Sequence, residues 1–313
     1  MTTNLYLTEG SYLPSDVNRE LISSLYGLER AMNEGIILES MAIKCDNDLR
    51  LSVDLGNYVG YIDKEDAVLT FGEETKDIAV ITRVGKPVCF KVISISKDNF
   101  GDPVIKLSRK EAQREYVDNV LRWSMPGDIL SAKVTHLEQF GAFVDIGCGV
   151  ISLLSIDSIS VSRISHPRDR FSVGADIRCV VRKNEDEGRR IYVTHKELLG
   201  TWEENVSEFN IGQTVTGIVR SVEDYGIFVE LSPNLAGLAE YKSDVYPGQS
   251  ASVFIKNIIP ERMKVKLVLI DTYDTPGANS EKCKYYISDD TDRIDEWTYS
   301  PGTCEKLIKT VFE

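Results

Sequence analysis

The chain has 313 residues, of which 42% are hydrophobic, and its net charge is −13. This length allows two or three domains, and no apolar run approaches the roughly 20 residues that a membrane span requires. So acidic a chain is not expected to bind nucleic acid through bulk charge alone. The six cysteines have no CxxC or CxxxC spacing, which favours free thiols, and residues 1–10 lack a signal-peptide pattern. We therefore expect a cytoplasmic protein without a membrane span.

The first 34 residues predict a helical N-terminal extension. Within residues 15–33, apolar side chains recur on one helical face: Val17, Leu21, Leu25, Leu28 and Met32. Ser15 is placed to cap the start of this helix, and Gly35 to end it. Residues 35–112 then hold five short runs rich in β-branched residues, which predict a small closed sheet.

A twenty-residue stretch occurs twice, as residues 127–146 and 212–231, 85 positions apart. Positions that are identical in the two copies are Gly127/Gly212, Val134/Val219, Glu138/Glu223, Gly141/Gly226, Phe143/Phe228 and Val144/Val229. A repeat of this kind predicts an array of one small module. Residues 49–56 align with 140–147 at a spacing of 91 but lack both aromatics and the central glycine, so the first module is a degenerate third copy.

The segments between and after the modules have their own signals. Residues 110–123 and 196–210 show helical spacing, and each holds one tryptophan, which predicts short, semi-rigid linkers. The tail is acidic, and its order is left open. Within it, residues 284–288 and 296–300 are candidate strands that pair with each other.

The shared pattern G-x-x-V-x-G-x-V-x-x-V-x-x-(F/Y)-G-x-F-V-(D/E)-L resembles the S1 RNA-binding domain family, here of the short bacterial ribosomal protein S1 type. The resemblance implies a mainly β chain of tandem five-stranded OB-fold barrels joined by short helical linkers. The expected division is 1–34 (helical extension), 35–112 (degenerate module), 113–125 (linker), 126–198 (best RNA-binding match), 199–208 (linker), 209–272 (shortened module) and 273–313 (acidic tail).

Aromatic pairs flank a glycine in both full repeats: Phe140 and Phe143 around Gly141, and Tyr225 and Phe228 around Gly226. Exposed rings stack on unpaired RNA bases, at roughly 1–3 kcal/mol per base, and a glycine lets the RNA backbone approach. The alternative is that one ring of each pair fills the barrel, because positions i and i+3 of a strand face opposite sides. The resemblance favours the RNA face.

Several basic residues have two open interpretations. Lys133 and Arg220, in the first strands of the full modules, contact phosphate or are ordinary solvated residues. The long loop of the second module carries a cluster that forms a phosphate-gripping rim or a solvated loop. This cluster is Arg163, His166, Arg168 and Arg170.

The resemblance implies three further RNA-binding positions. A histidine of the family falls at Ser152 in the second module and at Glu240 in the third, and Glu240 would repel phosphate. An Asp–Arg pair of the family falls at Asp186 and Arg190, whereas the third module keeps only the cation, Lys264. We therefore expect the third module to bind RNA more weakly than the second.

The sequence shows no catalytic motif, phosphate loop or metal-ligand spacing. We therefore expect a non-enzymatic protein without cofactor or metal. The resemblance implies binding of single-stranded RNA, with messenger RNA in translation as the expected target and small ribosomal subunit proteins as further partners. Two alternatives remain: a protein-docking adaptor at the ribosome, favoured by the acidic surface, and an accessory factor in RNA decay or transcription.

Overall fold

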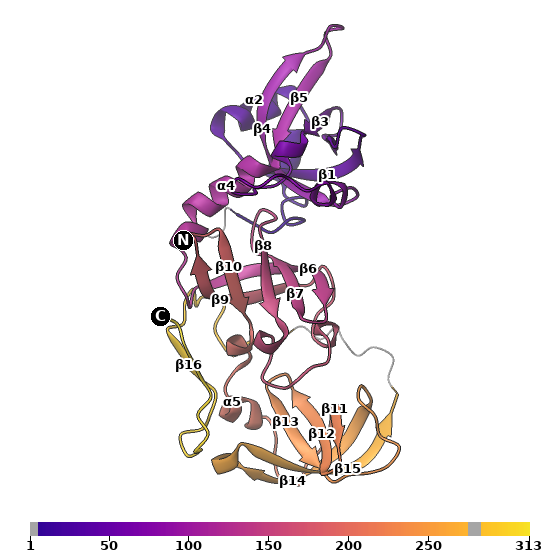
Figure 1. Ribbon diagram of the computed structural model, residues 1–313, viewed down its shortest axis with the longest axis vertical. Coiled ribbons are helices and arrows are strands. Elements are labelled where there is room, and N and C mark those ends of the chain that lie inside the picture. Colours follow the sequence, from indigo (N-terminus) through magenta and orange to yellow (C-terminus); the bar gives the residue numbers. More distant parts are fainter. Residues whose placement is uncertain (1–5, 275–282) are drawn as a thin grey trace.

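Three closed five-stranded barrels follow one another along the long axis of the molecule (Figure 1). The computed structural model describes residues 6–274 and 283–313. The strands of the first barrel are β1 (Leu38–Cys45), β2 (Leu51–Asp54), β3 (Val59–Ile62), β4 (Pro87–Lys97) and β5 (Pro103–Ser108). Those of the second are β6 (Ile129–Glu138), β7 (Gly141–Asp145), β8 (Ile151–Ser155), β9 (Asp176–Glu185) and β10 (Arg190–Thr194). Those of the third are β11 (Thr214–Glu223), β12 (Gly226–Ser232), β13 (Leu235–Ala239), β14 (Ser250–Ile259) and β15 (Lys264–Tyr273).

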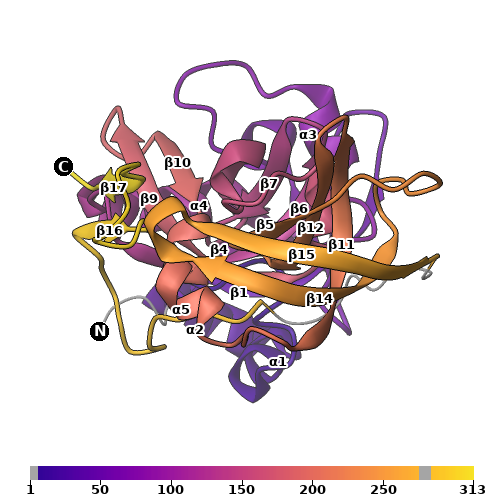
Figure 2. The ribbon, with the colours of Figure 1, turned by 90° about the horizontal axis from the view of Figure 1, so that it is seen from below.

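The three barrels share one topology. In each, the third strand pairs in parallel with the fifth, as in β3 with β5, and the other pairs are antiparallel. The first strand of each barrel also shifts register at the same place, between Ala42 and Lys44 in β1 and between Val134 and His136 in β6. The predicted mainly β fold of tandem OB-type barrels is confirmed. In Figure 2, β14 and β15 form the long hairpin of the third barrel.

The N-terminal extension contains two helices, α1 (Asp16–Ile22) and α2 (Leu25–Glu34). The prediction of one helix over residues 15–33 is therefore wrong. The hydroxyl of Ser24 accepts a hydrogen bond from the Gly27 backbone and starts the second helix. Gly35 ends α2 with a φ of 68°, as predicted, because glycine adopts this left-handed conformation readily.

Short helices join the barrels. The first linker is α4 (Arg109–Asn119) followed by η3 (Leu121–Trp123), and the second is η6 (Lys196–Leu199) followed by α5 (Trp202–Val206). The remaining short helices are η2 (Lys64–Asp66), α3 (Asp77–Ile81), η4 (Ile156–Ser158), η5 (Pro167–Asp169) and η7 (Pro260–Arg262). Within residues 6–274 and 283–313, no helix is long and apolar enough to cross a membrane.

Each linker contains a buried aromatic side chain, but in the first linker it is not the tryptophan. Trp202 is buried against the third barrel, whereas Trp123 is 72% exposed. The ring that fixes α4 is Tyr116, which is buried and donates a hydrogen bond of 2.6 Å to the Ile146 carbonyl.

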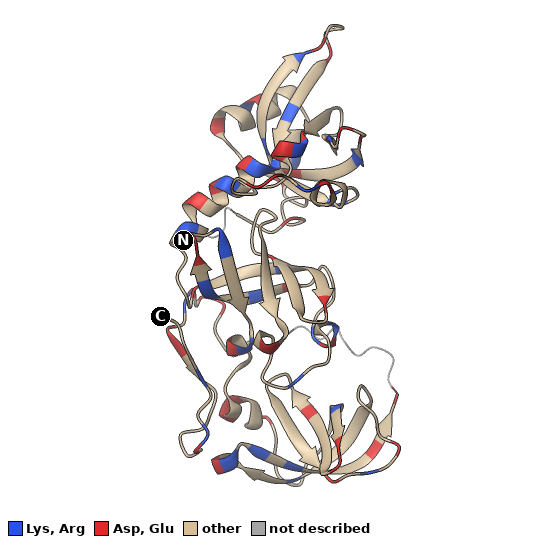
Figure 3. Ribbon diagram, in the orientation of Figure 1, with Lys and Arg blue, Asp and Glu red and all other residues tan. Residues whose placement is uncertain are grey.

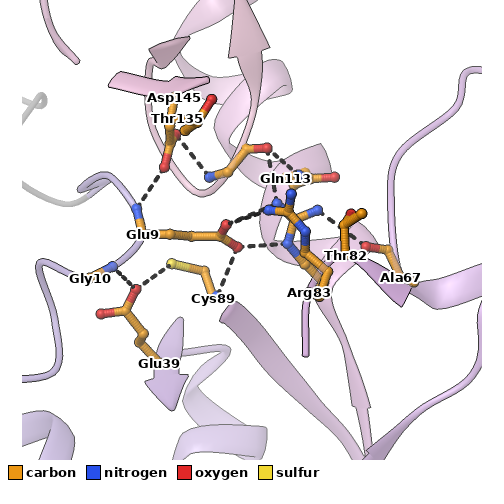
Figure 4. Close-up of polar contacts among 12 residues, drawn as sticks. Glu9, Gly10, Glu39, Ala67, Thr82, Arg83, Cys89, Gln113, Thr135 and Asp145 are labelled. Atoms are coloured by element: carbon orange, nitrogen blue, oxygen red, sulfur yellow. Dashed lines mark hydrogen bonds and ion pairs between the residues drawn. The ribbon is translucent and has the colours of Figure 1, made fainter. Parts of the chain in front are cut away.

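Residues 6–15 lie between the first two barrels, and Glu9 and Gly10 of this segment contact both (Figure 4). The Glu9 backbone donates to Asp145 of β7 at 2.7 Å, and the Glu9 carboxylate accepts from Arg109 of α4. Three backbone amides of this segment donate to the Glu39 carboxylate of β1: Gly10, Tyr12 and Leu13. Burial raises the pKa of Glu39 and brings that of Asp145 to about 7.

The described part of the tail is ordered and spans the second and third barrels. Two of its strands pair, β16 (Glu296–Thr298) and β17 (Lys309–Val311). The prediction that residues 284–288 pair with 296–300 is therefore wrong. Residues 287–291 instead place three carbonyls around the Arg178 guanidinium of β9. The predicted loop at residues 275–282 lies outside the described residues.

Candidate nucleic-acid interface

Each full repeat presents two rings on the outside of its barrel. The Phe140 and Phe143 ring centroids are 6.0 Å apart at 89°, and those of Tyr225 and Phe228 are 6.1 Å apart at 88°. Phe140 is 54% exposed and Tyr225 70%, whereas their partners are half-buried. The alternation of side chains along a strand does not put the two rings on opposite faces, because the first ring of each pair lies in the turn before the strand. An exposed edge-to-face pair offers a base a ring to stack on.

Around Phe143, the strand register assembles a row across the second barrel. His136 of β6 pairs with Phe143, Phe143 pairs with Leu153 of β8, and Leu153 pairs with Tyr192 of β10. Tyr192 in turn pairs with Lys183 of β9. Paired residues point to the same side of a sheet, so all five share the outer face. The His136 ring centroid lies 6.4 Å from that of Phe143.

Sequence reasoning missed His136, Tyr192 and Lys183 as candidates for this face. The signal that finds them is the pairing between strands, which the sequence does not display. Tyr192 is 37% exposed, and Lys183 and His136 are exposed. Lys183 and His136 each pair with one glutamate of their own strand, Glu185 and Glu138.

Equivalent rows exist in the other barrels, and each holds one aromatic ring, Phe228 in the third barrel and Tyr61 in the first. In the third barrel the row is Ser221, Phe228, Leu238, Lys266 and Asn257. In the first barrel it is Lys44, Ser52, Tyr61, Lys106 and Ser94. Ser52 stands where the other barrels have phenylalanine, so the first barrel lacks the ring pair, and its Lys106 is 3.0 Å from Asp63.

The glycines between the rings serve strand pairing. A Cβ on Gly141 would lie 2.5 Å from the Leu154 carbonyl oxygen, and one on Gly226 would lie 2.5 Å from that of Ala239. The expectation that these glycines make room for an RNA backbone is therefore wrong, because the neighbouring strand already occupies the space.

The predicted cations differ in availability. Lys133 is half-buried and 2.5 Å from Asp176, whereas Lys264 is exposed. The Arg220 side chain is 10% exposed and donates two hydrogen bonds to Glu230, at 2.9 and 3.0 Å. Asp169 lies 3.6 Å from the same guanidinium, so the structure favours an internal ion pair over the predicted phosphate contact of Arg220.

The prediction that Ser152 and Glu240 occupy equivalent positions in the two modules is wrong. Phe143 pairs with Leu153 and Phe228 pairs with Leu238, so the counterpart of Glu240 is Ser155. The Ser152 side chain is buried and donates to the Ile191 carbonyl at 2.7 Å. It therefore stabilises the barrel and does not face RNA.

Asp186 lies in the turn between β9 and β10, close to Arg190, the first residue of β10. The Arg190 Nε is 4.0 Å from the Asp186 carboxylate, and both side chains are more than half exposed. Arg190 and Tyr192 are both exposed and two residues apart on one strand, so they share the outer face. The predicted pair is therefore continuous with the row described above.

The candidate rim in the loop after β8 divides into exposed and buried members. Arg163 and Arg168 are exposed. The His166 ring caps η5 by accepting from the Arg168 backbone at 3.1 Å. The Arg170 side chain is 4% exposed and paired with Glu230. Arg170 is therefore not part of a rim, and with Glu230 it joins this loop to the third barrel.

The histidines do not form a metal site. In the described ranges, no group of three or more His, Cys, Asp or Glu residues could hold a metal ion. His195 is fully buried, and burial lowers its pKa to about 4. Its ring nitrogens lie 3.0 Å from the Ile159 carbonyl and 3.3 Å from the Tyr285 hydroxyl of the tail.

The strand topology places the three modules in the class of OB-type barrels. Residues 124–196 match the family described as S1 RNA binding domain, so the middle barrel is an S1 domain. The chain is also similar to the small ribosomal subunit protein bS1 of Staphylococcus aureus (strain COL), with 28% identity over 82% of this chain and 67% of that protein.

Similarity to bS1 extends to other bacteria. The bS1 protein of Rickettsia conorii (strain ATCC VR-613 / Malish 7) is 29% identical over 64% of this chain and 37% of its own length. Among solved structures, a multidomain protein with nucleic acid binding domains from Streptococcus pneumoniae is 15% identical over 78% of this chain and 76% of its own, with a TM-score of 0.25.

Proposed function

We propose that this protein is a non-enzymatic, ribosomal protein S1-like factor that binds single-stranded RNA, with messenger RNA in translation as its target. The observation that carries the proposal is the outward ring pair, repeated with the same geometry in the second and third barrels. The S1 family match and the similarity to bS1 support it. Since those relatives are ribosomal proteins, we place its action in the cytoplasm, beside the small subunit.

The charge distribution fits binding through rings with local cations. The net charge is −13, but β9 of the middle barrel carries Arg178, Arg182 and Lys183, and β10 begins with Arg190 (Figure 3). Lys183 belongs to the row, and Arg190 lies two residues from Tyr192 of that row. Stacking is available to every base, so sequence preference is expected to be modest. Two binding barrels in one chain raise the effective concentration of the second contact.

The direct test is anisotropy titration of fluorescent oligo(U) of 12 nucleotides. The Phe140→Ala plus Phe143→Ala variant should lose about 5- to 100-fold in affinity, the range expected for a lost base stack. Phe100→Ala is the matched control, because Phe100 is 91% exposed on the β4–β5 hairpin, outside the ring pairs. Unchanged affinity in the double variant would remove the second barrel from the RNA face.

A protein-docking role is the second candidate, and the first barrel favours it. This barrel has the OB topology but Ser52 in place of the ring. The salt dependence of binding distinguishes the two functions. Affinity for RNA through several cations falls steeply as salt is added, whereas affinity for a protein through an apolar patch does not. Co-sedimentation with small ribosomal subunits, with and without ribonuclease, shows whether RNA mediates the association.

A further inference from the structure

A cleft of about 500 Å³ separates the first barrel from the second. Its lining includes residues from both barrels and from the linker between them: Phe71, Lys76, Gln113, Ile151, Arg189 and Arg190. Ile151 and Arg190 lie two residues from Leu153 and Tyr192 on β8 and β10. Because side chains alternate along a strand, the outer face of the second barrel leads directly into the cleft.

Phe71 is the aromatic side chain of this cleft, and its backbone is unusual. It lies in the loop before α3, is 42% exposed, and has a φ of 51°. A turn holds it there, since the Glu73 backbone donates to the Thr70 carbonyl at 3.1 Å. Bulky residues rarely adopt positive φ, and those held in it cluster at ligand sites.

The Phe71 ring faces a cation of the other barrel. The guanidinium carbon of Arg189, in the β9–β10 turn, lies 5.4 Å from the ring centroid. Over the part of the chain that the structure describes, Arg189 has no ion pair. A ring and a guanidinium from different barrels thus meet across the cleft, where a planar base and a phosphate can both be bound.

The acidic residues of the cleft are partly neutralised. Glu74 lies 3.5 Å from Lys64, and Asp186 lies 4.0 Å from Arg190. Glu73 also borders the cleft, together with the exposed Lys76. Arg190 is engaged with Asp186, so among the described residues that line the cleft the cations without an ion pair are Lys76 and Arg189. Arg189 lies on the side that adjoins the row of the second barrel.

We propose that this cleft is an additional nucleotide subsite. The RNA chain leaves the outer face of the second barrel past Tyr192, a base stacks on Phe71, and Arg189 contacts the adjoining phosphate. The proposal rests on the proposed function and extends it, because it gives the first barrel a direct RNA contact although that barrel lacks the ring pair. The bound segment is single-stranded RNA longer than one barrel covers.

The test compares fluorescent oligo(U) of 6 and 12 nucleotides bound to the full chain. Phe71→Ala and Arg189→Gln should each reduce affinity for the 12-mer, Phe71→Ala by about 5- to 100-fold, and change that for the 6-mer less than twofold. Phe100→Ala, at an exposed phenylalanine of the same barrel, should change neither. Photo-crosslinking of a 12-mer containing 4-thiouridine should label a peptide that contains Phe71.

The two proposals fail in different ways. If the Phe140→Ala plus Phe143→Ala variant loses affinity while Phe71→Ala binds the 12-mer as wild type does, with no crosslink to the 68–79 loop, the subsite is absent and the proposed function stands. If the double variant also binds normally, the RNA face itself is wrong. A circular dichroism melt of Phe71→Ala that matches wild type assigns a loss of affinity to the missing ring.

Discussion

Arg109 donates two hydrogen bonds to Glu9, from Nε at 2.6 Å and from Nη2 at 3.0 Å, and both side chains are at least nine-tenths buried. The same guanidinium donates to the carbonyls of Ala67 in the first barrel and Gly149 in the second. A buried charge is costly unless it is fully paired. Here the pairing is complete only when both barrels and the N-terminal segment are in place, so the arrangement fixes their relative position.

Replacing either Arg109 or Glu9 alone should therefore lower the free energy of unfolding strongly. Arg109→Met leaves the buried Glu9 carboxylate with Arg83, at 3.4 Å, and the Cys89 backbone amide, at 3.2 Å, as its remaining partners, and should cost about 3–5 kcal/mol. Adding Glu9→Gln should recover part of the loss, because the buried carboxylate is then replaced by a neutral amide, although Arg83 loses its ion-pair partner. Differential scanning calorimetry of the three proteins measures this. A single variant as stable as wild type would show that the pair is not buried in solution.

Gly141→Ala should destabilise the second barrel and weaken RNA binding. The new Cβ would lie 2.5 Å from the Leu154 carbonyl oxygen, so the β7–β8 pairing must open, at about 1–3 kcal/mol. Gly302→Ala is the control, because nothing lies within 4 Å of its Cβ position and no positive φ is involved. Thermal unfolding of both variants checks the prediction, which fails if they melt alike.

The barrel fold was predictable because its signals are local and repeated. The 85-residue repeat and the match of residues 49–56 to 140–147 reveal three copies, and the shared register shifts agree. The N-terminal segment and the tail were not predictable in the same way. Their contacts join residues far apart in the chain, 100 positions for Glu9 with Arg109 and 90 for Tyr285 with His195.

The candidate site was predictable only where its residues adjoin a motif. Phe140 and Phe143 stand beside a glycine in a recognisable pattern, whereas Tyr192 joins them through pairing across three strands. Arg220 and Arg170 carry the expected charge, but their side chains are 10% and 4% exposed and both pair with Glu230. A sequence records that a residue is basic and does not record that a carboxylate from another barrel lies beside it.

His195 should make the tail contact sensitive to acid. Burial lowers its pKa from 6.5 to about 4, so the folded protein keeps the ring neutral while the unfolded chain takes up a proton below pH 6.5. Wild-type stability therefore falls as pH drops from 7 to 5, by about 2 kcal/mol from this group. The His195→Asn variant has no imidazole at this position, so its stability does not fall for this reason. The difference in unfolding free energy between the two proteins, from urea titrations, should shrink at pH 5, and a constant difference would contradict the prediction.

The third barrel should contribute less to RNA affinity than the second. Glu240, next to β13, occupies the position of Ser155, and its charge repels phosphate. The Tyr225→Ala plus Phe228→Ala variant should therefore lose less affinity than the Phe140→Ala plus Phe143→Ala variant. Glu240→Ser should raise affinity about 2- to 5-fold at low salt, with a smaller gain at high salt. Anisotropy titrations at two salt concentrations measure both, and a decrease on Glu240→Ser would place the RNA elsewhere.

Trp297 should hold the tail on the third barrel through its ring rather than through its N–H. The side chain is buried in the core of that barrel, 5.5 Å from Tyr299 between ring centroids, and within the described residues its Nε1 has no hydrogen-bond partner. Trp297→Phe keeps most of the ring contact and removes an unpaired donor, so it should change stability by less than about 1 kcal/mol.

Trp297→Ala, by contrast, should cost about 3–5 kcal/mol and expose residues 283–313 to protease. Because the Tyr299 hydroxyl donates to the Asn234 carbonyl, and the Asn234 amide donates to the Gly200 carbonyl, release of the tail should also loosen the second linker. Limited proteolysis followed by mass spectrometry should therefore find new cuts in both segments for the alanine variant and in neither for the phenylalanine variant. Equal cutting in the two variants would mean that the buried N–H, and not the ring, decides the contact.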